Sequence, residues 1–182
     1  MTEPPLNPKA QKERSAQVMF ETFGTPGFYL ASVPLLAIYA SGRGSAISVH
    51  IGDGVTHVAQ VYEGYSNEYA TRRLDFAGKD LTGHLQTLLH ERGYDFSTSS
   101  ELETLREIKE RLCYVAKDYE QELTGPVQER TYELPDGKTV TVGSEMFKCP
   151  EALFRPIQGL NCGGIQHLIK SHMDATDIDC RP

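Results

Sequence analysis

The stretch that decides the fold is HIGDGVTHVAQVYEGYSNEYATRRLDFAGKD, residues 50–80. It opens with a glycine-bracketed acidic turn, Gly52-Asp53-Gly54. Glycine lets the backbone approach a ligand closely and adopt positive φ, so such a turn can place amide N–H groups against a phosphate. The turn is a candidate phosphate loop, although the same three residues alone are more typical of a plain hairpin turn.

The segments around this turn predict a mixed architecture. Residues 45–51 and 55–62 are rich in β-branched and apolar side chains and predict two strands joined by the turn. A second hairpin is predicted at 130–134 and 138–142, around Pro135-Asp136-Gly137. Helices are predicted between the hairpins, so the fold class is α/β or α+β.

Two predicted helices follow residue 80. Asp80 is expected to cap a helix that runs to about residue 91. Ser100 and Glu103 have the spacing of a capping box, and they predict the start of the next helix. The apolar face of that helix is expected to include Leu102, Leu105, Ile108, Leu112, Val115 and Tyr119.

Composition narrows the classes of function. A chain of 182 residues, 39% hydrophobic and 24% charged, is ordinary for a soluble protein of one domain or two small ones. A net charge of −7 without a basic stripe argues against direct nucleic-acid binding. The apolar stretch 28–40 is too short to span a bilayer, and residues 1–17 are not a secretory signal. We expect no membrane partner and an intracellular location.

The four cysteines contain no C-x-x-C pair, so neither a disulfide framework nor a zinc framework is expected. Cys113 lies on the predicted apolar helix face and is expected to be a buried free thiol. The other three are Cys149, Cys162 and Cys180.

Ten segments, in order and over roughly residues 2–179, closely resemble the actin family. The resemblance implies the α/β fold that actin shares with sugar kinases and heat-shock chaperone ATPases. It covers about the middle half of an actin, so the fold is expected to be incomplete at both ends, with open strand edges. The segments are TEPPLNPKAQKER, VMFETFGTP, YASGR, GDGVTH, YEGY, RLDFAGKDLT, ERGYDF, IKERLCYVAKDYEQE, YELPDGKTVTVG and FKCPEALF.

The resemblance also implies domain boundaries. Residues 1–43 correspond to part of the outer large subdomain of actin. Residues 44–76 together with 160–182 correspond to part of the inner large subdomain. Residues 77–159 correspond to the inner small subdomain.

The family's nucleotide site is carried over residue by residue. The cofactor implied is ATP or ADP with Mg²⁺ or Ca²⁺, and His57 matches a histidine near the γ-phosphate. The positions that match phosphate contacts are Gly52, Asp53, Gly54 and Val55, and those that match adenosine-side contacts are Gly78, Arg106, Lys109 and Glu110.

Two departures count against ATP hydrolysis. The glutamine that orients the attacking water in actin aligns with Val33, which can neither donate nor accept a hydrogen bond. The aspartate that supports the bound metal aligns with His50, which supplies no hard anionic oxygen. The first phosphate loop of actin is also absent. We therefore expect no catalytic residue and no enzyme activity, with His57 a remnant of the family site.

Simpler structural interpretations remain for the other candidates. Arg106, Lys109 and Glu110 have the spacing of charges on the solvated face of an amphipathic helix. His50, Asp53 and His57 could suggest a metal site, but residues flanking a hairpin turn are expected to face different ways, so no metal site is predicted.

Three hypotheses for function follow. The first is an actin-like cytoskeletal or structural interaction protein that does not hydrolyse ATP, located in the cytoplasm with protein partners. The second is a nucleotide-binding fragment of a conventional actin. The third is an actin-related subunit of a larger nuclear complex.

Overall fold

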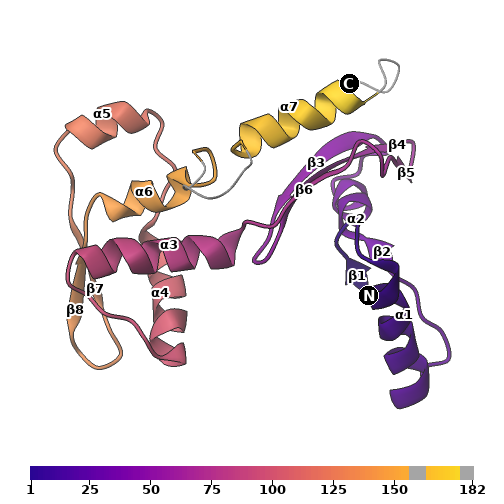
Figure 1. Ribbon diagram of the computed structural model, residues 1–182, viewed down its shortest axis with the longest axis horizontal. Helices are drawn as coiled ribbons and strands as arrows, with labels where there is room; N and C mark the ends of the chain where they lie inside the picture. The colour runs from indigo at the N-terminus through magenta and orange to yellow at the C-terminus, as the bar shows by residue number, and fades with distance from the viewer. Residues whose placement is uncertain (156–162, 177–182) are drawn as a thin grey trace. The chain divides into compact units, whose positions relative to one another are not determined.

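The computed structural model describes residues 1–155 and 163–176. The chain forms two compact units, each with its own helices and strands (Figure 1). Unit 1 consists of Met1–Asp75 and the C-terminal segment from His167, and unit 2 is the continuous stretch Phe76–Gln166. The mixed helices and sheets confirm the predicted α/β class.

Unit 1 begins with a short parallel strand pair and two helices. Strand β1 pairs with β2 through Thr2 opposite Ala31 and Glu3 opposite Ser32. Pro34 occupies the first turn of helix α2, where a missing N–H costs nothing because that group has no partner inside a helix. The elements are β1 (Thr2–Glu3), α1 (Lys9–Gln17), the π-helical turn η1 (Val18–Thr22), β2 (Ala31–Ser32) and α2 (Val33–Ala40).

The main sheet of unit 1 has four strands, and it confirms the predicted hairpin. Strand β3 pairs with β4, and β4 pairs with both β5 and β6, all antiparallel. Val58, Ala59 and Val61 of β4 are fully buried, because β4 is central in the sheet. The strands are β3 (Ala46–Ile51), β4 (Thr56–Tyr62), β5 (Tyr65–Ser66) and β6 (Arg72–Leu74).

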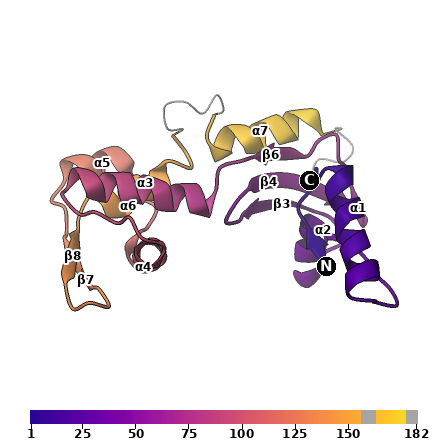
Figure 2. The same cartoon turned by 60° about the horizontal axis from the view of Figure 1, so that its bottom comes forward.

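Helix α7 (Ile165–Ala175) brings the end of the chain to this sheet. Arg72 of β6 donates a hydrogen bond from Nε to Ser171 Oγ at 3.1 Å. The fully buried His172 lies with Nδ1 2.6 Å from the carbonyl oxygen of Ala70. These contacts hold α7 beside β6 (Figure 2).

Unit 2 is built on helix α3, which packs against α4 and α6. Leu85 and Leu89 of α3 and Leu105 and Ile108 of α4 are fully buried. Strands β7 and β8 form the second predicted hairpin, which is thereby confirmed. The elements are α3 (Gly78–Glu91), α4 (Ser99–Leu112), α5 (Tyr119–Thr124), β7 (Arg130–Glu133), β8 (Thr139–Val142) and α6 (Glu145–Glu151).

The predicted helix starts in unit 2 were wrong by two or three residues. Ala77, not Asp80, is the N-cap of α3, and Asp80 instead accepts a 2.9 Å hydrogen bond from the Ala77 N–H through Oδ2. The capping box of α4 is Thr98 with Glu101, not Ser100 with Glu103. In both helices a carboxylate in the first turn satisfies a backbone N–H that the helix itself leaves free.

The predicted apolar face was also too long. Helix α4 ends at Leu112 because Cys113 is extended and the Tyr114 N–H donates to the Met146 carbonyl. Val115 is consequently exposed. Cys113 is half-buried and Cys149 buried, and both are free thiols. Cys162 and Cys180 lie outside the described residues.

Among residues 1–155 and 163–176, no helix combines the length and the apolar character needed to cross a bilayer.

The predicted boundary between residues 43 and 44 falls inside unit 1, and the three-part division stays a prediction.

Candidate functional site

The glycine-bracketed turn lies between β3 and β4 of unit 1. The Gly52 N–H donates to the Val55 carbonyl oxygen at 3.0 Å and closes the turn, while Asp53 and Gly54 are exposed. A Cβ atom at Gly52 would lie only 3.2 Å from His50 Nε2 and 3.3 Å from the Val55 oxygen. Any larger residue would push against the turn, so the geometry explains the glycine at this position without a ligand.

His50 and His57 lie opposite each other across the two strands. Their ring centroids are 4.9 Å apart and their planes differ by 23°, so the imidazoles are stacked. The expectation that the two side chains face different ways was therefore wrong. The reason is the register: β4 begins at Thr56 rather than at residue 55, and a shift by one residue moves a side chain to the other face.

His57 is a buried polar group with no hydrogen-bond partner in the described part of the chain. Its side chain is 1% exposed, and neither Nδ1 nor Nε2 has a partner. Burial lowers the pKa of His57 to about 4, and the neighbouring His50 and Arg73 act in the same direction. Arg73 lies opposite His57 on β6 and forms an ion pair with Asp75 at 2.8 Å. The residue is held as the neutral imidazole.

The donor set beside the turn does not fit a hard divalent cation. Mg²⁺ and Ca²⁺ take carboxylate, carbonyl and water oxygens, whereas His50 and His57 offer imidazole nitrogens. Within the described ranges, no group of three His, Cys, Asp or Glu side chains is placed to hold a metal ion. Val33, at the first position of α2, is half-buried and contributes only methyl groups.

The adenosine-side candidates lie in unit 2, and the structure brings two of them together. Lys109 Nζ donates to the Gly78 carbonyl at 2.6 Å and to Thr82 Oγ1 at 2.9 Å. The half-buried ammonium therefore ties α4 to the first turn of α3. Two of its three N–H donors are engaged by neutral oxygens of the protein.

Arg106 and Glu110 form a separate pair on the exposed face of α4. Arg106 Nε lies 3.0 Å from Glu110 Oε1, and its Nη1 lies 3.4 Å from Glu103 Oε1. Both partners of the closer pair are at least half exposed, so the spacing matches the solvated helix face that the sequence also allowed. The four phosphate-side candidates and His57 belong to unit 1, and the four adenosine-side candidates belong to unit 2.

Sequence reasoning missed two residues that matter in unit 1. Arg73 of β6 lies opposite His57 on the adjacent strand β4, and His172 anchors α7 through its contact with Ala70. A strand prediction at 72–74 with its register would have placed Arg73, but these residues gave no clear pattern. No local signal marks His172, because its partner lies 102 residues away along the chain.

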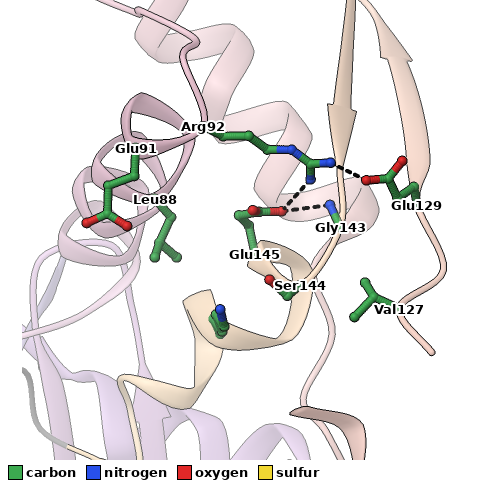
Figure 3. A pocket seen from close by; sticks show the side chains of 9 residues that line it. Leu88, Glu91, Arg92, Val127, Glu129, Gly143, Ser144 and Glu145 are labelled. Carbon is green, nitrogen blue, oxygen red and sulfur yellow. Dashed lines mark hydrogen bonds and ion pairs between the residues drawn. The ribbon is translucent and has the colours of Figure 1, made fainter. Parts of the chain in front are cut away.

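A cavity of about 390 Å³ in unit 2 brings charged side chains together. Figure 3 shows the Arg92 guanidinium reaching Glu129 on one side and Glu145 on the other. Glu145 also accepts a 2.7 Å hydrogen bond from the Gly143 N–H. Both carboxylates engage the Arg92 guanidinium, so this cation is not free to bind an anionic ligand.

Comparison with protein families agrees with the sequence resemblance. The family model described as Actin matches residues 1–182, the whole of the chain. The chain belongs to the actin family.

Proposed function

We propose that this actin-family chain is an interaction protein of the cytoskeletal type that does not hydrolyse ATP. The observation that carries the proposal is the stacked His50–His57 pair beside the phosphate turn. An imidazole at residue 50 supplies no oxygen to metal-bound water, and His57 is neutral and buried beneath it. Phosphoryl transfer depends on positioned charge, and this arrangement offers little of it.

Val33 supports the same proposal from the neighbouring helix. A water molecule must be oriented by hydrogen bonds before it can attack a phosphoryl group, and an isopropyl side chain makes none. Lys109 supports it from unit 2, because its ammonium is engaged by Gly78 and Thr82. Under this proposal the chain acts in the cytoplasm with protein partners. The alternative is that it acts as a subunit of a larger nuclear complex.

The test combines a thermal melt with a phosphate-release assay, both with and without Mg-ATP. A ligand that binds only the folded state raises the melting temperature, so the melt reports binding independently of hydrolysis. We expect no phosphate release above buffer for the natural chain. The variant carrying Val33→Gln and His50→Asp serves as the matched comparison, since it restores both side chains that the family resemblance predicts.

Release of phosphate by the natural chain, lost on Asp53→Ala but kept on Asp136→Ala, would overturn the proposal. Asp136 is an exposed residue of the β7–β8 turn and provides the control for a general effect of removing a carboxylate. A melting shift without hydrolysis would support a nucleotide-regulated interaction protein.

A further inference from the structure

Unit 2 contains two free thiols that lie beside each other. Cys113 directly follows the last residue of α4, and Cys149 lies in α6. The two side chains are hydrogen-bonded to each other through their sulfur atoms. Cys149 Sγ also lies at hydrogen-bond distance, 3.4 Å, from the Leu81 carbonyl oxygen of α3. The fold therefore brings together two sulfur atoms that are far apart in the sequence.

The backbone holds this pair of thiols in place. The Tyr114 N–H, next to Cys113, donates to the Met146 carbonyl oxygen at 3.1 Å. The Tyr114 ring also packs near the ring of Phe147, with 6.3 Å between the ring centroids. Met146 and Cys149 are three residues apart in α6 and so lie on the same side of that helix. The extended backbone after α4 thus runs along α6 and places Cys113 against Cys149.

The two thiols differ in acidity and in access to solvent. The hydrogen bond from Cys149 lowers the pKa of Cys113. The charge of Lys109 acts in the same direction, whereas burial and Glu145 act against it. The hydrogen bond to Cys113 and burial both raise the pKa of Cys149. Cys113 is half-buried and Cys149 is buried, so the thiolate, which is the reactive form, develops on the more accessible sulfur.

We propose that Cys113 and Cys149 are a peroxide-reactive dithiol that closes to a disulfide inside unit 2. Redox-sensing cysteines share this arrangement, in which an accessible thiolate lies beside a second thiol that resolves its oxidised form. Such disulfides are transient in a reducing compartment, so the proposal agrees with the absence of a structural disulfide framework.

The reaction takes two steps and consumes one molecule of hydrogen peroxide. The Cys113 thiolate attacks one peroxide oxygen, and the O–O bond breaks. This leaves a sulfenic acid on Cys113, and the hydroxide that departs takes up the proton released by the Cys113 thiol. The Cys149 sulfur then displaces hydroxide from the Cys113 sulfur, and that hydroxide leaves as water with the Cys149 proton. The two sulfurs together lose two electrons, and the peroxide is reduced to two molecules of water.

The disulfide would join the end of α4 to α6 by a covalent bond. It would close the segment from residue 113 to residue 149, which contains α5 and the β7–β8 hairpin. A cross-link of this kind restricts the unfolded chain, so oxidised unit 2 should be harder to unfold than reduced unit 2. The proposal concerns unit 2 alone and goes beyond the proposed function, on which it does not depend.

The test maps disulfides in the full chain after treatment with hydrogen peroxide, alkylation of the remaining thiols and digestion with trypsin. Cys113 lies in the tryptic peptide 112–117. Trypsin does not cut before Pro156, so Cys149 and Cys162 share the peptide 149–170. The natural chain is therefore compared with a variant that carries Cys162→Ser and Cys180→Ser. We expect both chains to yield peptide 112–117 linked to peptide 149–170, with loss of the alkylated form of Cys113.

Cys149→Ser, in the background without Cys162 and Cys180, is the matched variant. It removes the resolving sulfur but keeps a hydrogen-bond donor beside Cys113. Peroxide should then leave Cys113 as a sulfenic acid, which dimedone traps, and no disulfide should form. Treatment of the natural chain in urea is the control for folding, and it should give a mixture of pairings among the four cysteines.

The natural chain keeps the test decisive even where a variant does not fold. Recovery of both Cys113 and Cys149 as alkylated thiols overturns the proposal. A disulfide from Cys113 to Cys162 or to Cys180 overturns it as well, and so does a link that joins two copies of the chain on a non-reducing gel. Equal yields of the link between residues 113 and 149 in buffer and in urea would show that the fold does not select this pair.

Discussion

The β3–β4 hairpin of unit 1 and the α3–α4 helix pair of unit 2 differ in whether their polar side chains have hydrogen-bond partners. In the hairpin, the buried imidazole of His57 has no hydrogen-bond partner in the described chain and lies between His50 and Arg73. In the helix pair, the ammonium of Lys109 has two partners. The stability of the hairpin should therefore depend on the protonation of His57. The helix pair is instead stabilised by packing and by hydrogen bonds that are already formed.

The largest expected effect tests packing in the helix pair. Leu105→Ala should lower the free energy of unfolding by about 3 kcal/mol, because the removed atoms are fully buried against α3 and leave a cavity. Urea denaturation measures the change. Leu102→Ala, on the same helix but 37% exposed, is the control and should cost far less. If both variants lost the same free energy of unfolding, burial would not explain the cost of these substitutions.

The next effect is the acid sensitivity of the hairpin. The unfolded chain protonates His57 near pH 6.5 and the folded chain only near pH 4, so the unfolded state binds more protons between these values. Stability should be fully present above pH 6.5 and fall by on the order of 2 kcal/mol as the pH drops to about 4. His57→Gln should flatten this fall in denaturation curves recorded at several pH values.

His84 of α3 supplies the comparison in unit 2. Burial lowers the pKa of His84, but the nearby Glu91 opposes that shift. His84→Gln should therefore flatten the pH dependence less than His57→Gln does. The reverse order would place the acid-sensitive histidine in the helix pair and not in the hairpin.

The smallest effect concerns the tie between α4 and α3. Lys109→Met keeps the aliphatic stem but removes the bonds to Gly78 and Thr82, which should cost about 1 kcal/mol. Arg106→Met removes exposed ion pairs from the same helix and should change stability little. Thermal melts of the two variants separate a packing role for Lys109 from a general effect of charge.

The sequence predicted the parts of the fold that depend on neighbouring residues. Both hairpins follow from local alternation and turn residues, and their strand bounds agree within about one residue. The capping box of α4 could not be placed, because Thr98 with Glu101 and Ser100 with Glu103 have the same spacing. Only the geometry of the preceding loop selects between them, and the structure selects Thr98.

The residues of the candidate site come from the family resemblance and stay a prediction, but their arrangement in space could not be predicted from the sequence. Family resemblance named the residues, yet the stacking of His50 on His57 depends on a register that differs by one residue from the predicted strands. The bond from Lys109 to Gly78 joins two helices, and its geometry does not follow from the periodicity of either helix.

The attachment of α7 has a consequence for the order of events during synthesis. His172 and Ser171 close unit 1 through contacts with residues about a hundred positions earlier, at Ala70 and Arg72. The whole of Phe76–Gln166 is translated between them. On the ribosome, unit 2 can thus fold as one continuous segment, while β6 in the sheet of unit 1 can pair with β4 but lacks its contacts with α7 until the last helix is made.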